Sequence, residues 1–507
     1  MLEKRLLLTL TICTAVSLSI SQTAHAQIDE FKLTASDGSE INWFGYSVSI
    51  SGNYVIVGAE RDDDNGEASG SAYIFKRSGS DWVQEAKLHS FDGNTGDFFG
   101  VSVSISGDYA IVGALGDDEN GQASGAAYIF KRTGTNWVQE AKLLAPTADI
   151  GDLFGHAVSI SGDYAIASTF LTDDNGENSG SAYVFKRAGT SWVQEAKLVA
   201  SDGATNDYFG WSVSISGDYL VVGAVRDNDN GIDAGSAYVF KRSDTTWVEE
   251  TKLLAADGAA DDGFGVSVSI SGDYVIVGSV FDDDNGDNSG SAYIFRHSDS
   301  NWVQEAKLHS SDGDTADFFG VSVSISEKSV VVGAFLTDDK GDSSGSAYIF
   351  SREGSNWVEG AKLLAFDGSA SDWFGWSVAI AGDYAVVGAY LDDDNGENSG
   401  SAYVYSGILV GIDDEKGELP TEFALSQNYP NPFNPNTVIK YTLPNRSEVK
   451  LIIYNLRGEE VALLFNGTMP AGNHRISWDA SNFASGIYFY RLRAGDYVQT
   501  KKMVFLK

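Results

Sequence analysis

Paired carboxylates followed by Asn-Gly recur along most of the chain and are the residues best suited to chemistry. In the first copy they are Asp62 and Asp64, just before Asn65-Gly66. Carboxylate and amide oxygens are the hard ligands that Ca²⁺ takes in proteins. The pattern therefore predicts calcium in some of these loops. The candidate ligands are Asp62, Asp64, Asp117, Glu119, Asp173, Asp174, Asp227, Asp229, Asp282, Asp284, Asp338, Asp339, Asp392 and Asp394.

A second interpretation of the same loops needs no metal. Asp, Asn and Gly are also good turn residues, and an excess of charge keeps a protein soluble. The calcium pattern is imperfect, because Arg61 stands at the first ligand position of the loop, where a carboxylate is expected. Both interpretations stay open at the level of sequence.

Aromatic residues beside a repeated Phe-Gly pair are the candidates for ligand binding. Trp43, Tyr208, Trp211, Trp373 and Trp376 flank this pair in some copies and are replaced in others. Variable aromatic residues on a constant framework are typical of a binding surface. Other tryptophans keep one place in the repeat, so we expect them to pack between repeated units: Trp82, Trp137, Trp192, Trp247, Trp302 and Trp357.

Motifs for catalysis are sparse. The sequence has no nucleophile elbow, zinc-ligand spacing or phosphate loop, and its histidines do not fall in a repeated polar cluster. Paired carboxylates, which glycosidases use, occur only as a repeated feature and not as one unique site. We therefore expect no enzymatic activity, and a secreted polysaccharide-active enzyme is the alternative.

All these residues are positioned by one repeat. The Phe of the Phe-Gly pair stands at 44, 99, 154, 209, 264, 319 and 374, a constant step of 55 residues (99 − 44). The first unit contains four short runs typical of strands, at 46–50, 54–57, 71–75 and 82–88. Four antiparallel strands repeated seven times predict an all-β fold, a seven-bladed β-propeller over residues 27–406.

The two ends of the repeat region are expected to complete one blade together. The seventh unit lacks its fourth strand, because residues 412–418 are mostly charged. Residues 27–33 instead match the fourth strand of the first unit, with Lys32 in the register of Lys87. Pairing of this segment with the last blade would close the ring and leave no open end.

The repeat resembles a known family. The Phe-Gly start, Val57-Gly58-Ala59 and the third strand Gly70–Phe75 are similar to the FG-GAP repeats of the integrin α-subunit propeller, and most similar to bacterial FG-GAP repeats with an Asp-Asp-Asn-Gly-x-x-Ser-Gly loop. This resemblance implies a propeller that binds other molecules with one face and commonly binds calcium. The integrin-type calcium loop lies between strands one and two, where this chain has only a Ser-Gly-Asp turn.

The ends of the chain predict export. Lys4-Arg5, the apolar run Leu6–Ile20 and Ala24-His25-Ala26 are typical of a signal peptide over residues 1–26. The one cysteine, Cys13, lies inside it, so the mature chain has no disulfide, and we expect no transmembrane segment there.

Residues 407–424 form an acidic linker, and residues 425–507 predict a small Ig-like β-sandwich. This tail resembles the type A C-terminal sorting domain of the bacterial type IX secretion system. The segments that carry this resemblance are 428–435, 449–458, 470–474, 478–480, 484–491 and 502–507. The resemblance implies the type IX machinery as a partner, and release or attachment at the outer cell surface.

The charge of the chain limits its partners. The net charge is −37, and the repeats are more negative than the chain as a whole because the C-terminal tail is net positive, which disfavours nucleic acid and anionic membranes as partners of the repeats. The loops that join strands two and three, and strand four to the next blade, share one face in such a fold, and both are acidic. The sequence thus predicts a secreted or cell-surface adhesion protein whose acidic face binds an extracellular protein or a glycan. A passive surface-layer component is a further alternative.

Overall fold

The computed structural model describes residues 28–408 and 423–506, apart from positions 80, 148, 299–300, 429–430, 432, 434–435, 470–471, 481–482 and 496. The described residues form strands, turns and loops, without a helix, in two compact units. The predicted signal peptide and most of the predicted linker lie outside these residues. Among the described residues, no helix is long and apolar enough to span a membrane.

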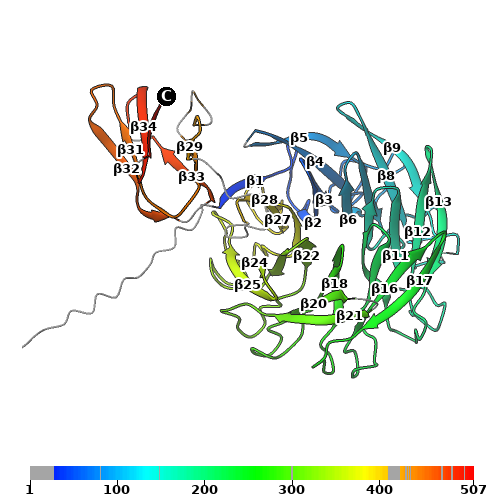
Figure 1. The fold of residues 1–507 in the computed structure, drawn as a ribbon. Helices are drawn as coiled ribbons and strands as arrows, with labels where there is room; N and C mark the ends of the chain where they lie inside the picture. The colour runs from blue at the N-terminus through cyan, green and yellow to red at the C-terminus, as the bar shows by residue number, and fades with distance from the viewer. Residues whose placement is uncertain are drawn as a thin grey trace, which may run out of the picture. The chain divides into compact units, whose positions relative to one another are not determined.

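The first unit is a ring of seven four-stranded antiparallel sheets, the blades of a β-propeller (Figure 1). The innermost strands are β2 (Phe44–Ser51), β6 (Phe99–Ser106), β10 (Val158–Ser161), β14 (Phe209–Ser216), β18 (Phe264–Ser271), β22 (Val323–Ser326) and β26 (Ser377–Ala381). The second strands are β3 (Tyr54–Ala59), β7 (Tyr109–Ala114), β11 (Tyr164–Thr169), β15 (Tyr219–Ala224), β19 (Tyr274–Ser279), β23 (Ser329–Ala334) and β27 (Tyr384–Ala389). The third strands are β4 (Ser71–Ser78), β8 (Ala126–Thr133), β12 (Ser181–Ala188), β16 (Ser236–Ser243), β20 (Ser291–Ser298), β24 (Ser346–Glu353) and β28 (Ser401–Ser406). The outer strands are β5 (Asp81–Leu88), β9 (Asn136–Leu143), β13 (Ser191–Leu198), β17 (Thr246–Leu253), β21 (Asn301–Leu308), β25 (Asn356–Leu363) and β1 (Asp29–Leu33).

The ring closes through its N-terminal strand, as the sequence predicted. β1 pairs antiparallel with β28, with Asp29 opposite Ser406 and Leu33 opposite Ala402. The last blade therefore takes its outer strand from the start of the propeller. This pairing joins the two ends of the repeat region and leaves no unpaired blade edge at the seam.

The Phe-Gly pair has a steric explanation in each blade. Phe99 is fully buried and packs against the rings of Tyr128 and Phe130. Gly100 has a φ of 98°, and a Cβ on it would lie 2.3 Å from the carbonyl oxygen of Ser71 in the preceding blade. Any larger residue would collide with that backbone, so glycine permits the close approach of neighbouring blades.

The tryptophans that keep one place in the repeat pack between blades, which confirms the prediction. Trp137 lies edge-on to Tyr54 of the preceding blade, with ring centroids 6.0 Å apart, and its Nε1 donates to Glu85 at 3.2 Å. The other pairs across blades are Trp82–Tyr384, Trp192–Tyr109, Trp247–Tyr164, Trp302–Tyr219 and Trp357–Tyr274.

The second unit is a small β-sandwich. One sheet has the order β29 (Ala424–Leu425), β30 (Asn436–Leu443), β33 (Gly472–Asp479), and the other β32 (Glu460–Met469), β31 (Ser447–Tyr454), β34 (Gly486–Ala494), β35 (Tyr497–Phe505). Buried residues from both sheets, among them Ile439, Trp478, Leu451 and Tyr490, form a single core. The sandwich predicted for the tail is confirmed.

Candidate ligand-binding face

Two kinds of loop meet at one end of the propeller. Acidic loops join the second and third strands, and lead-in loops join each outer strand to the next inner strand. Backbone hydrogen bonds tie them together across blades: Phe99 N donates to Ser69 O at 3.0 Å, and Gly96 N donates to Glu67 O at 2.9 Å. The two sets of loops therefore form one continuous surface, which we call the loop face.

A lysine lies among the carboxylates of the first acidic loop. Lys87 Nζ is 2.9 Å from Asp37, 3.1 Å from Asp62 and 2.5 Å from Asp64. The Tyr73 hydroxyl lies 2.9 Å from Asp62 and 3.0 Å from Asp37. Because Asp62 is only 1% exposed, its charge needs a close partner, and the ammonium supplies it. We call this arrangement the lysine–carboxylate cluster.

The cluster recurs around the ring. Its lysine and acidic members in other blades are Lys142 with Asp92, Asp117 and Glu119; Lys252 with Asp202, Asp227 and Asp229; Lys307 with Asp257, Asp282 and Asp284; and Lys32 with Asp367, Asp392 and Asp394. In the third and sixth blades, Thr172 and Thr337 replace the buried aspartate. Lys197 and Lys362 of these blades still contact Asp174 and Asp339 at 2.5 Å.

Two of the predicted metal ligands have a different role. Asp173 accepts a hydrogen bond from the backbone N–H of Asn178 at 2.8 Å, and Asp338 accepts one from Ser343 at 2.8 Å. Both carboxylates shape their own loop and do not contact the lysine. The other predicted ligands belong to the clusters. The lysines and the lead-in aspartates such as Asp37 were missed as partners, although both recur at the period of the repeat.

The clusters do not fit calcium as they stand, since an ammonium group already occupies the position between the carboxylates. Among the described residues, no group of three or more His, Cys, Asp or Glu side chains is arranged to hold a metal ion. Calcium in these loops stays a prediction, and an ion that uses the clustered carboxylates would have to displace a lysine.

Two sets of aspartates in the lead-in loops have pKa values shifted in opposite directions: those in the clusters, such as Asp37, and those two residues before Phe-Gly. Burial favours neutral Asp37, but hydrogen bonds from Lys87 and Tyr73 outweigh it and lower the pKa of Asp37. For Lys87, burial opposes the charge, but hydrogen bonds to the carboxylates raise its pKa. The aspartates two residues before Phe-Gly lack such a partner. Burial raises the pKa of Asp207, Asp262 and Asp372 to about 6, although each accepts a backbone hydrogen bond.

The predicted aromatic residues lie half-buried at the inner end of the loop face, in two clusters. Trp43, Trp373 and Trp376 form one with Tyr46 and Tyr390, with ring centroids 5.2–6.1 Å apart. Tyr208 and Trp211 form the other with Phe170 and His156. These four additional rings were not predicted, although their positions vary between repeats just as those of the predicted residues do.

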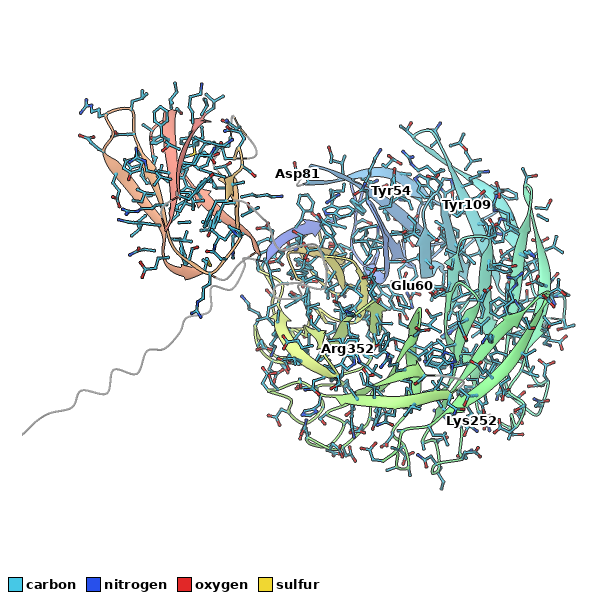
Figure 2. The ribbon with its side chains drawn as sticks, in the orientation of Figure 1. Tyr54, Glu60, Asp81, Tyr109, Lys252 and Arg352 are labelled. Carbon is cyan, nitrogen blue, oxygen red and sulfur yellow. The ribbon has the colours of Figure 1, made fainter. Side chains whose placement is uncertain are left out.

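An acidic residue beside the first aromatic cluster was also missed. Glu60 is 6% exposed, and burial raises its pKa to about 7, while Arg61 partly opposes this effect. Figure 2 shows Glu60 toward the inside of the ring and Lys252 on its outer side. The guanidinium of Arg61 lies 4.4 Å from the ring of Trp43 and 5.3 Å from that of Phe98, within the range of cation–π attraction.

Large apolar side chains are exposed in the loops of this face. They are more than half exposed at Ile41, Phe91, Ile150, Ile232 and Phe366. Exposed apolar groups gathered on one side of a soluble protein are typical of an interaction surface.

The architecture defines the class of protein: a seven-bladed β-propeller with one elaborated loop face, followed by a β-sandwich. The profile of the FG-GAP repeat matches the chain seven times, at residues 28–75, 82–130, 137–185, 192–240, 247–295, 302–350 and 357–405. The chain belongs to the FG-GAP repeat family. The profile of the secretion system C-terminal sorting domain matches residues 427–506. No curated protein matches the chain.

The C-terminal domain identifies the secretion pathway of the protein. A sorting domain of this kind is handled by the type IX secretion system, so the protein is secreted or placed at the outer cell surface. Both resemblances noted in the sequence are thereby confirmed.

Proposed function

We propose that this protein is a binding or adhesion protein that meets an extracellular protein or a glycan with the loop face of its propeller. The observation that carries the proposal is that the loops of this face hold both the variable aromatic side chains and, among the described residues of the propeller, the exposed Phe and Ile side chains. The rest of each blade is nearly constant from repeat to repeat, as expected of a scaffold that presents changing loops.

Binding to a panel of extracellular matrix proteins and neutral polysaccharides tests this proposal. Replacement of exposed loop residues, Phe91→Ser with Phe366→Ser, is expected to weaken binding to a panel member by about tenfold, since these side chains lie at the proposed contact. The matched control is Val83→Ser with Val138→Ser, which changes apolar side chains that are also more than half exposed but stand on the outer strands. Weaker binding in the control and unchanged binding in the loop variant would contradict the proposal.

The same incubations test the enzymatic alternative. A binding protein leaves each polysaccharide at its original length. The appearance of shortened chains with new reducing ends would favour a polysaccharide-active enzyme instead.

Calcium dependence is a separate proposal for the same face. Thermal unfolding with calcium, magnesium or chelator measures it, because an ion bound only by the folded state raises the midpoint. A rise specific to calcium would support metal binding in the acidic loops. Equal small shifts of the unfolding midpoint with both divalent ions would show that the ions only screen the negative charge, and the calcium proposal would fail.

A further inference from the structure

One position of the repeat carries a large side chain in every blade except one. It directly precedes Phe-Gly and is occupied by Trp43, Phe98, Leu153, Tyr208, Gly263, Phe318 and Trp373. The backbone φ at these positions lies between 54° and 64°. This left-handed conformation is uncommon for residues other than glycine. Six blades thus keep a large side chain at the inner loop face despite an unfavourable backbone, and the fifth blade omits it.

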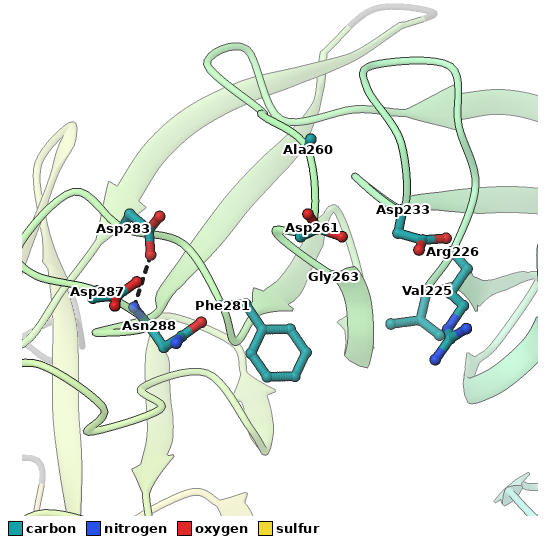
Figure 3. Close-up of a pocket in the computed structure, with 10 residues that line it drawn as sticks. All are labelled: Val225, Arg226, Asp233, Ala260, Asp261, Gly263, Phe281, Asp283, Asp287 and Asn288. Carbon is teal, nitrogen blue, oxygen red and sulfur yellow. Dashed lines mark hydrogen bonds between the residues drawn. The ribbon is translucent and has the colours of Figure 1, made fainter.

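A cavity of about 440 Å³ opens where that side chain is missing (Figure 3). We call it the Gly263 notch. Its apolar lining includes Val225 and Phe281, and Phe281 is 43% exposed. Figure 3 shows this ring facing the gap beside Gly263, with Arg226 across it. The notch lies between the acidic loops of the fourth and fifth blades, where no blade-to-blade side chain fills it.

The first two blades show one way in which this place is filled. Arg61 lies between two rings, Trp43 of its own blade and Phe98 of the next. Arg226 occupies the same place in the fourth blade, and its guanidinium lies 5.1 Å from the ring of Tyr208. The second ring of that pair would come from position 263, which is glycine. The notch is therefore the vacant half of an aromatic–guanidinium–aromatic stack.

We propose that the Gly263 notch takes an aromatic side chain of a partner protein, which completes this stack against Arg226 and packs on Phe281. The inference rests on the proposed function and names the chemistry of its contact. The carboxylates of Asp233, Asp261, Asp283 and Asp287 surround the notch, so its lining is net negative with one arginine. Basic residues beside the aromatic one complement this rim and favour association with the acidic face.

The variant Gly263→Phe tests the proposal by filling the notch from within. Phenylalanine already adopts this backbone at positions 98 and 318, and an added Cβ would meet first the ring of Phe281, 3.1 Å away, which is an exposed side chain able to turn aside. The matched control is Gly354→Phe, which has the same φ of 64° in a hairpin turn at the other end of a blade, with no atom within 4 Å of its Cβ. Circular dichroism and thermal unfolding establish that both variants are folded.

The probe is an acetylated, amidated Lys-(4-fluorophenylalanine)-Lys peptide, followed by ¹⁹F NMR with the full chain. We expect it to bind the unchanged protein and the Gly354→Phe variant, and to bind Gly263→Phe at least about tenfold more weakly. Phe281→Ser, which removes the floor of the notch, is expected to weaken binding as well. Equal binding to Gly263→Phe would overturn the proposal. So would displacement of the peptide by an equimolar neutral hexasaccharide, which would assign the notch to a sugar ring.

Different results would contradict the notch proposal and the proposed function. Panel binding that is lost with Phe91→Ser and Phe366→Ser but kept with Gly263→Phe would overturn the notch and leave the proposed function standing. Panel binding that none of these variants weakens would contradict the proposed function itself.

Discussion

Asp62 illustrates how a buried carboxylate is stabilised beneath an exposed acidic loop. Its side chain is enclosed, yet it contacts the hydroxyl of Tyr73 and the ammonium of Lys87 at 2.9 and 3.1 Å. An unpaired charge at this depth would be costly, and a pair of opposite charges that are both hydrogen-bonded is much less so. The repeated lysine is therefore an internal counter-ion for the acidic loops.

Removal of one such lysine gives the first prediction. Lys87→Met leaves Asp37, Asp62 and Asp64 without their cation. Because Asp62 is buried and Asp64 is largely exposed, we expect the free energy of unfolding to fall by about 2 kcal/mol, below the loss for a fully buried pair. Denaturant unfolding measures this change.

Lys76→Met is the control for that prediction. Lys76 is more exposed and makes one ion pair, to Glu85 at 3.5 Å, so its loss is expected to cost at most about 0.5 kcal/mol. Equal stability of the two variants would show that the cluster contributes nothing beyond a surface ion pair.

At the scale of the elements, sequence periodicity was sufficient to predict the seven blades and the closure of the ring by β1. The period aligns Lys32 with Lys87, so the outer strand of the last blade could be predicted although it lies at the opposite end of the repeat. Periodicity alone does not state which repeated residues converge in space. Lys87 and Asp37 are 50 positions apart, and only the blade geometry brings them within 2.9 Å.

The Gly263 notch could not be predicted from sequence for a related reason. The absence of a side chain at Gly263 can be interpreted only when the spatial positions of the equivalent residues in the other blades are known. The sequence contains the substitution, but the stack of Trp43, Arg61 and Phe98, which shows what is absent, exists only in the folded loops.

The glycine of the Phe-Gly pair gives the prediction for the inner strands. Gly100→Ala would place a Cβ 2.3 Å from Ser71 O at a φ of 98°. The clash and the unfavourable backbone together should lower the free energy of unfolding by at least about 2 kcal/mol. Gly107→Ala is the control, since its φ is also positive but no atom lies within 4 Å of its Cβ, and about 1 kcal/mol is expected. Similar losses in the two variants would argue against the role of close blade approach.

At the scale of the whole molecule, the shifted carboxyl groups predict an acidic optimum of stability. Asp207, Asp262 and Asp372 have a pKa of about 6 in the folded protein against 3.8 ordinarily, and Glu60 about 7 against 4.5. The folded state thus binds protons more readily than the unfolded one, so stability rises as the pH falls through this range. Asp37 and its equivalents have lowered pKa values, so their contribution is present above pH 3.8 and is lost as the pH falls below it.

The unfolding temperature is therefore expected to rise from pH 8 to about pH 5 and to fall again below about pH 4. The variant Asp262→Asn, which cannot titrate, should have a smaller rise over the upper range. The cluster lysines have raised pKa values, so their contribution to stability is constant below pH 10.5 and is lost only above it. They therefore leave this profile unchanged. A profile that is flat or falls steadily from pH 8 to pH 5 would contradict the raised pKa values of these buried carboxyl groups.

The most direct test of the binding face is hydrogen–deuterium exchange of the protein, free and bound to a panel member that it recognises. Exchange of the lead-in loops, such as residues 89–98, 254–263 and 364–373, is expected to slow on binding, together with that of the acidic loops. The hairpin turns between the third and outer strands should exchange at the same rate in both states. Protection confined to those turns or to the C-terminal sandwich would contradict the assignment of the loop face as the binding surface.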